Sequence, residues 1–83
     1  MGFSIEEEIS VLTGHIKRLG QQQDEGIQVT FKELFDDDSV ANTLESLAGT
    51  LKAAKRKKIV SYKAELLLQG MSDKEVITLK EDK

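Results

Sequence analysis

Two segments of this chain repeat apolar residues at the spacing of an α-helix, and each repeat forms one apolar stripe. The first stripe runs through residues 5–19 and the second through residues 39–56, which predicts two long amphipathic helices. Both stripes have to be buried, and a chain of 83 residues has room for one small domain. We therefore expect the two helices to share a core that contains Leu12, Ile16, Leu44, Leu47 and Leu51.

Local signals mark the ends of both predicted helices. Ser4 and Glu7 have the spacing of a capping box, and Gly20 follows the first helix as a C-cap. The acidic residues 36–38 precede the second helix, where carboxylates favour the positive end of the helix dipole. Basic residues close both helices and complement the negative end of each dipole.

The remaining segments are shorter. Residues 31–35 are expected to form a brief helix that begins with a second capping box, and both of its phenylalanines, Phe31 and Phe35, are expected to anchor the core. The leucines of the strand predicted at residues 65–69 would suit a helix equally well. Strands are predicted at residues 27–31, 59–62, 65–69 and 76–79, and a polar loop at residues 20–26.

This order of elements indicates the class of fold. Helix, strand, short helix, long helix and then strands is the order of a winged-helix domain. We predict an α+β, winged-helix-like fold in which a helical bundle packs on a short antiparallel sheet. It is expected to form a single domain over residues 1–83, with a core at about residues 5–79 and a tail at 80–83 that frays.

The composition leaves little for catalysis. The chain has no cysteine and one histidine, His15, which excludes zinc sites and Cys-His chemistry. Its six glycines are scattered and form no phosphate-binding loop. We expect residues 36–38 to cap a helix rather than hold Mg²⁺ or Ca²⁺, because consecutive side chains point in different directions. We predict no enzymatic activity, no catalytic residue and no cofactor.

The sequence also favours one compartment. It contains no run of about 18 apolar residues that would span a membrane. Its first residues are acidic where a secretory signal would be basic, so we expect a cytoplasmic protein. The net charge is -3, which argues against a nucleic-acid-binding role.

A basic cluster at the end of the second helix is the strongest charge feature. It places five of the 12 basic residues within seven positions: Lys52, Lys55, Arg56, Lys57 and Lys58. One interpretation is a solvated helix end that complements its dipole. The other is a patch for an anionic partner, and an acidic protein surface fits better than DNA, because the acidic residues 36–38 would repel phosphates.

The face opposite the second apolar stripe carries neither charge nor bulk. Its residues are Asn42, Thr43, Ser46, Gly49, Thr50 and Ala53. A helix face in water usually carries long polar side chains, and a glycine inside a helix costs about 1 kcal/mol relative to alanine. Packing against the first helix or the sheet would explain this face, and so would a flat docking surface for a partner.

Several of these segments together resemble one family. FKELFDDD at 31–38, AN at 41–42, LAGTLKAAKRKKIV at 47–60 and ELLLQG at 65–70 closely resemble the Costars family. That family is similar to the C-terminal actin-binding domain of actin-binding Rho-activating protein, also called the striated-muscle activator of Rho signalling. The resemblance covers roughly residues 5–79 and implies a winged-helix-like fold and regulation of the actin cytoskeleton without catalysis.

The partner and the contact residues follow as hypotheses. We expect a monomeric, cytoskeleton-associated protein that binds actin, the filament rather than the monomer, without contacting nucleic acid or membrane. An adaptor for another cytoskeletal or signalling protein is the first rival, and a nucleic-acid-binding winged helix is the second. The predicted contact residues are Asn42, Ser46, Gly49, Thr50, Lys52, Lys55, Arg56, Lys57 and Lys58.

Overall fold

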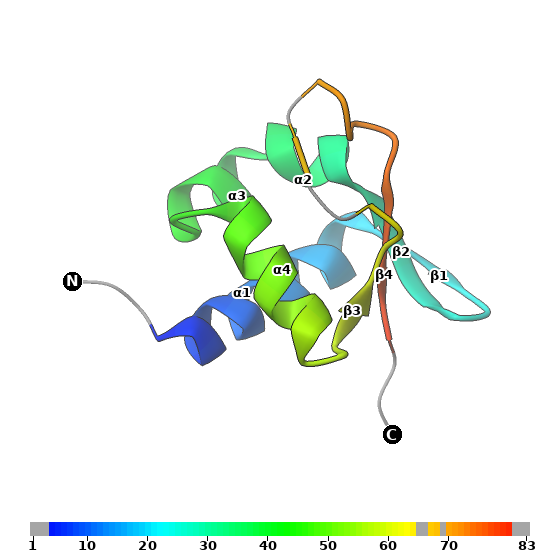
Figure 1. Ribbon diagram of the computed structural model, residues 1–83, viewed down its shortest axis with the longest axis horizontal. Helices are drawn as coiled ribbons and strands as arrows, with labels where there is room; N and C mark the ends of the chain where they lie inside the picture. Colours follow the sequence, from blue (N-terminus) through cyan, green and yellow to red (C-terminus); the bar gives the residue numbers. More distant parts are fainter. Residues whose placement is uncertain (1–3, 65–66, 69, 81–83) are drawn as a thin grey trace.

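A computed structural model of the chain describes residues 4–64, 67–68 and 70–80 (Figure 1). Helices pack on one side of a four-stranded antiparallel sheet, which confirms the predicted α+β class. The winged-helix comparison itself stays a prediction. In chain order the elements are α1 (Ile5–Leu19), β1 (Gln21–Gln23), β2 (Gly26–Thr30), α2 (Phe31–Asp36), α3 (Asp38–Thr43), α4 (Leu47–Arg56), β3 (Val60–Ser61) and β4 (Val76–Leu79).

The first helix has the predicted bounds and the predicted cap. The Ser4 hydroxyl accepts a hydrogen bond from the Glu7 amide at 3.2 Å, and the Glu7 carboxylate accepts one from the Ser4 amide at 3.1 Å. Two amides at the start of the helix, which have no partner within it, are thereby satisfied. The apolar stripe of α1 is buried at Leu12 and Ile16, both with no exposed surface.

The sheet contains one strand that the sequence analysis missed. Its strand order is β1-β2-β4-β3, and all neighbours are antiparallel. The predicted loop at residues 20–26 is wrong, because Gln21–Gln23 pairs with β2 as β1. All three glutamines are exposed, so β1 is held by backbone pairing and shows no apolar alternation. Gly26 completes this hairpin with φ 141°, and a side chain there would collide with the Leu79 carbonyl of β4.

The second long helix predicted at residues 39–56 is wrong, because the chain breaks there into α3 and α4. Leu44 leaves the helical conformation at φ -118° and ψ 133°, while its side chain stays in the core. The Ser46 hydroxyl then accepts a hydrogen bond from the Gly49 amide and starts α4. A serine cap inside an otherwise periodic apolar run therefore turns one predicted helix into two.

The short helix α2 begins as predicted, with a capping box between Thr30 and Glu33. Its two phenylalanines have different surroundings. Phe31 is buried, whereas Phe35 keeps 40% of its surface exposed, so the expectation that both anchor the core is wrong for Phe35. The two rings still contact each other, with 5.9 Å between their centroids. Residues four apart lie on the same side of a helix, so the rings are neighbours, but burial in α2 is limited to Phe31 and Leu34, and Phe35 lies one turn further along the chain.

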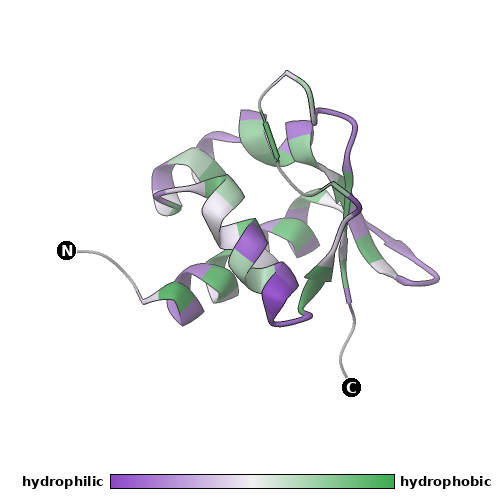
Figure 2. Cartoon of the chain, in the orientation of Figure 1, coloured by the Kyte–Doolittle hydropathy of each residue, from purple (hydrophilic) through white to green (hydrophobic). Residues whose placement is uncertain are grey.

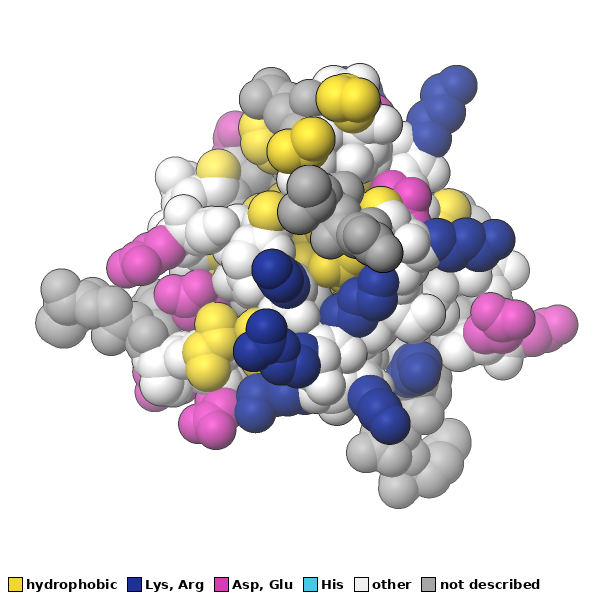
Figure 3. All heavy atoms as spheres, in the orientation of Figure 1, with side chains coloured by type: hydrophobic (Ala, Val, Ile, Leu, Met, Phe, Trp, Pro, Cys, Tyr) yellow, Lys and Arg dark blue, Asp and Glu magenta, His cyan; other side chains and the backbone are white. Residues whose placement is uncertain are grey.

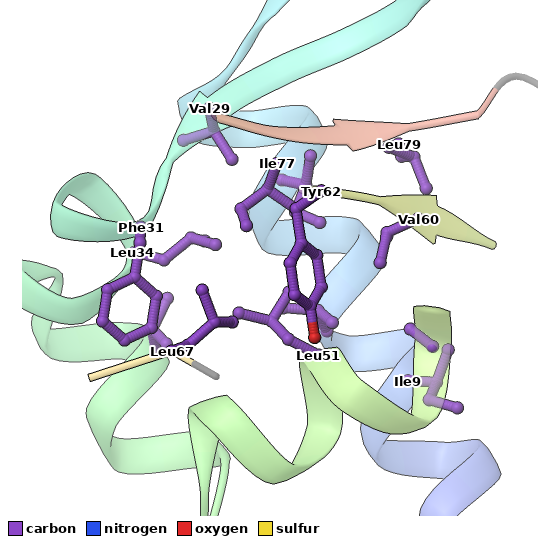
Figure 4. Packing of buried hydrophobic residues seen from close by; sticks show 14 of the residues in the cluster. Ile9, Val29, Phe31, Leu34, Leu51, Val60, Tyr62, Leu67, Ile77 and Leu79 are labelled. Carbon is purple, nitrogen blue, oxygen red and sulfur yellow. The ribbon is translucent and has the colours of Figure 1, made fainter. Parts of the chain in front are cut away.

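The core lies between the helices and the inner face of the sheet (Figure 4). The Tyr62 ring lies among Ile77, Leu51 and Val60 and joins the sheet to α4. Hydrophobic residues line the inner surfaces of the elements, while the last turns of α4 are hydrophilic (Figure 2). Leu12, Ile16, Leu44 and Leu51 share this core as predicted, but Leu47 is only partly buried at its edge.

The C-terminal part contains two of the predicted strands. The strand predicted at residues 59–62 is shorter, at Val60–Ser61, and the strand at residues 76–79 is confirmed. The strand predicted at 65–69 falls partly outside the described residues, and Leu67 and Leu68 belong to neither a strand nor a helix. Of the predicted tail, Lys80 is held by a hydrogen bond from its amide to the Ile59 carbonyl, and the residues after it lie outside the description.

Candidate functional site

The basic cluster lies where α4 ends in a tight turn. The Lys58 amide donates to the Lys55 carbonyl and the Ile59 amide donates to the Ala54 carbonyl, both at 2.9 Å. This pair of bonds is a Schellman motif, in which glycine usually occupies the left-handed position. Here that position holds Lys58, at φ 65°. A side chain with a positive charge therefore stands where glycine would be less strained.

One predicted contact residue is already used by the fold. The Lys55 ammonium lies 4.3 Å from the centre of the Tyr62 ring and donates to the Ala64 carbonyl at 3.3 Å. Both contacts fix the segment after β3 against α4, and the charge lies over the face of an aromatic ring. Lys55 therefore stays a predicted contact residue, but its charge is directed at the protein itself.

Thr50 is another predicted contact residue that the fold uses, and it is 1% exposed. Its hydroxyl lies 2.9 Å from Glu8 Oε1 of α1 and 2.9 Å from the Ser46 carbonyl. Thr50 therefore satisfies a carboxylate buried between α1 and α4 and offers no surface to a partner. The uncharged face predicted for one helix is thus divided, because Thr50 faces inward while Ser46 and Gly49 are exposed.

The remaining small residues also lie apart. Asn42 is exposed on α3, beyond the break that separates the two helices. At Gly49 an added Cβ atom would lie 3.0 Å from the Ser46 hydroxyl oxygen, which is a tight contact beside the capping bond. The missing side chain therefore keeps both the N-terminal turn and the surface of α4 open.

The predicted residues that do come together form a shallow hollow of about 450 Å³ on the surface of α4. Ile5 of α1, which is 43% exposed, forms its apolar edge and was not predicted. The other lining residues come from α4 and its C-cap: Gly49, Lys52, Ala53, Arg56 and Lys57. In Figure 3, Lys and Arg side chains gather over the end of α4, and hydrophobic surface lies directly beside them. This hollow is the candidate site.

The charges at this site have no counter-ions in the part of the chain that the structure describes. Elsewhere in that part of the chain, ion pairs join Lys32 to Asp36 and Arg18 to Asp37, each with 2.9 Å between a side-chain nitrogen and a carboxylate oxygen. No carboxylate among these residues reaches Lys52 or Arg56. An unpaired cation in water is solvated at no cost, so these positions are free to meet an anionic surface.

Two of the acidic residues at 36–38, Asp36 and Asp37, form contacts within the fold. The Asp37 carboxylate caps α3 through the Val40 amide and accepts two hydrogen bonds from the Arg18 guanidinium of α1. The bonds from Arg18, with that from the Val40 amide, lower the pKa of Asp37 to about 2. The same guanidinium reaches His15 Nδ1, and the other ring nitrogen, Nε2, lies 2.8 Å from Thr43 Oγ1.

The described residues form neither a metal-ligand cluster nor a membrane-spanning helix. No group of three or more metal-binding side chains gathers there. None of the helices has both the length and the apolar character needed to cross a membrane.

Comparison with known proteins gives a single family. The family model described as Costars matches residues 4–80. A Costars family protein of Nematostella vectensis is 54% identical over 80 residues, which cover 95% of this chain and 98% of that protein. The Costars family protein ABRACL of Xenopus laevis is 48% identical over 80 residues, which cover 95% of this chain and 99% of that protein. The solution structure of human HSPC280 protein superimposes with a TM-score of 0.85 at 47% identity, covering 96% of this chain and 95% of that one.

Proposed function

This chain belongs to the Costars family, and from that premise we propose that it is a non-enzymatic protein that binds actin and modulates the organisation of the actin cytoskeleton. The family's likeness to an actin-binding domain supports the choice of partner. The observation that carries the proposal is the hollow on α4, where unpaired Lys52 and Arg56 flank Gly49 and the exposed Ile5. The protein would act in the cytoplasm, as a monomer on the filament.

Charge explains how such a surface finds its partner. Actin filaments are acidic, so clustered cations without counter-ions raise the rate of encounter, and salt screens this effect. The described cations on the exposed side of α4 and its turn are Lys52, Arg56, Lys57 and Lys58. Filament binding should therefore weaken as the salt concentration rises.

Shape explains how the complex then forms. Close docking requires a surface from which few charged groups have to be desolvated, because burial of an unpaired charge costs several kcal/mol. Gly49 and Ala53 form such a surface between the cations, and Ile5 adds apolar area at its edge. A ring of charge around a small uncharged floor is the usual anatomy of a protein interface.

Filament co-sedimentation at physiological salt tests the proposal. The parent should pellet with filaments, and the double variant Lys52→Glu, Arg56→Glu should bind at least about tenfold more weakly, because each reversal turns an attraction into a repulsion. The matched control is Lys63→Glu, Lys74→Glu, which makes the same change in net charge at exposed positions that do not line the hollow. All variants should keep the circular dichroism spectrum of the parent.

Two results would contradict the proposal. A parent that stays in the supernatant at every salt concentration does not bind filaments, and an adaptor role would then explain the surface better. A control that loses as much binding as the α4 variant would show that only net charge matters and that the hollow is not the contact.

A further inference from the structure

The hollow on α4 is one end of a longer groove, because two neighbouring hollows share its residue Lys57. The second, of about 310 Å³, lies between α1 and the turn after α4 and is lined by Ile9, Thr13 and Ile59 among others. The third, of about 530 Å³, shares Thr13, Lys57 and Ile59 with the second and continues to Lys80 after β4. We call the three together the basic groove. It follows α1 from Ile5 to Lys17.

The floor of the basic groove is apolar. Exposed Ile5 lies at one end and partly buried Ile59 in the middle, while Ile9 and Leu79, each 4% exposed, are core residues that the groove reaches at their edges. These side chains come from α1, the turn after α4, and β4, so no single segment of the sequence reveals them. The apolar surface that remains in water, mainly that of Ile5 and Ile59, is removed from it only when an apolar group from another molecule covers it.

The rim of the basic groove is cationic. Six cations line it: Lys17, Lys52, Arg56, Lys57, Lys58 and Lys80. Glu6 is the one carboxylate among the described lining residues, and none of the six cations forms an ion pair within the described chain. Half of the 12 basic residues of an acidic protein are thus gathered along one groove.

We propose that the basic groove binds an acidic amphipathic segment of a protein, with apolar side chains on the floor and carboxylates against the rim. This inference rests on the proposed function in one respect, which is that actin would supply the segment. Nucleic acid fits less well, because the lining residues include no aromatic ring on which a base could stack. A membrane fits less well too, because Ile5 is the one exposed large hydrophobic residue among the described lining residues, and a single side chain offers little apolar area for insertion.

A synthetic peptide that carries glutamates and leucines at helical spacing provides the probe. Two further peptides serve as comparisons, one with serines in place of the leucines and one with lysines in place of the glutamates. Fluorescence anisotropy at physiological salt should show that the serine peptide binds at least about tenfold more weakly, because burial of a leucine contributes about 1.4 kcal/mol or more. The lysine peptide should not bind.

A matched pair of variants locates the peptide. Thr13→Gln places a longer side chain where the second and third hollows meet, and it should weaken peptide binding about tenfold. Gly14→Gln adds the same side chain one position along α1, where no atom lies within 4 Å of the new Cβ, and it should leave binding unchanged. Circular dichroism checks that both variants fold.

The outcomes separate this inference from the proposed function. If Thr13→Gln pellets with filaments and binds the peptide as the parent does, the groove inference is wrong and the proposed function stands. If the parent fails to pellet but binds the peptide and loses it with Thr13→Gln, the groove inference holds and actin is the wrong source. Equal binding of the leucine and serine peptides, or displacement of the peptide by duplex DNA at physiological salt, would overturn the groove inference.

Discussion

The two sides of α1 differ in whether their polar side chains have partners within the protein. On one side, Glu8, His15 and Arg18 each bind a residue in or directly before a later helix: Thr50 of α4, Thr43 of α3 and Asp37, the N-cap of α3. On the other side, Thr13 and Lys17 border the basic groove, whose cations have no counter-ion in the described chain. We call these the closed side and the open side of α1.

The difference separates charge that holds the fold from charge that is available to a partner. On the closed side each contact joins residues far apart in sequence and fixes α3 and α4 against α1. On the open side the cations repel one another. None of the ion pairs in the described chain uses them to hold the fold. Removal of a polar side-chain group on the closed side should therefore lower stability, and removal of a charge on the open side should weaken binding; a change in stability on the open side has to come from the backbone.

The largest effect on stability is expected on the closed side at Thr50. Thr50→Val keeps the shape of the side chain but removes the hydroxyl that satisfies the Glu8 carboxylate, which is 7% exposed. A buried acceptor without its donor should lower the free energy of unfolding by about 1–3 kcal/mol, measured by chemical denaturation. Thr50→Ser retains the hydroxyl and should lose less. A folded Thr50→Val variant that no longer pellets with filaments would show that Thr50 belongs to the binding surface.

The sequence predicts α1 well because its cap and its apolar spacing agree and each needs only local information. It fails at the break between α3 and α4, because Leu44 keeps its place in the apolar pattern while its backbone turns away from the helix. The hydroxyl of Ser46 decides where α4 begins, and serine is ordinary both on a helix surface and at a cap. The strand β1 escapes prediction because three glutamines carry no apolar pattern.

The candidate site is predictable only in part for a similar reason. Lys52, Arg56 and Gly49 lie on one helix, so their spacing is enough to bring them together. Ile5 joins them from α1 through the tertiary fold, and a partly exposed isoleucine at a helix start gives no signal in one sequence. Lys55 looks like its basic neighbours until the Tyr62 ring is placed beneath it.

The next effect is a gain in stability on the open side. Lys58→Gly relieves the left-handed backbone at φ 65° and should raise the free energy of unfolding by about 1 kcal/mol. The same change removes a cation from the basic groove, so filament binding should weaken while stability rises. Lys57→Gly is the control, because Lys57 has φ -86° and gains nothing from glycine. A Lys58→Gly variant that is less stable than the parent would show that the lysine side chain supports the fold.

A neighbouring pair compares the two sides directly. Arg18→Gln breaks two hydrogen bonds to Asp37 and should lower the melting temperature while filament binding at low temperature is retained. Lys17→Gln removes the same charge from the adjacent position and should weaken filament binding while leaving the melting temperature unchanged. Equal loss of binding by both variants would mean that the distinction between the two sides of α1 is wrong.

The smallest effect is the pH dependence of the closed side. The Arg18 guanidinium can only donate, so His15 Nδ1 accepts its bond and carries no proton. The Thr43 hydroxyl donates to the Ser39 carbonyl, so Nε2 carries the proton and donates to Thr43 Oγ1. This arrangement requires a neutral ring. Burial first, and then Arg18, lowers the pKa of His15 below 6.5, although Asp37 acts in the opposite direction.

Two steps of destabilisation on acidification follow from these directions. The unfolded chain binds a proton at His15 more readily, so stability should begin to fall as the pH drops below 6.5. The pKa of Asp37 is lowered from 3.8 to about 2, so a second contribution is present above pH 3.8 and is lost as the pH falls toward 2. Denaturation midpoints measured from neutral pH to pH 2 should show that His15→Gln lacks the first step and Asp37→Asn lacks the second. If His15→Gln follows the parent between pH 7 and pH 5, protonation of His15 does not open the closed side, and the Arg18–Asp37 pair is the pH-dependent contact between α1 and the start of α3.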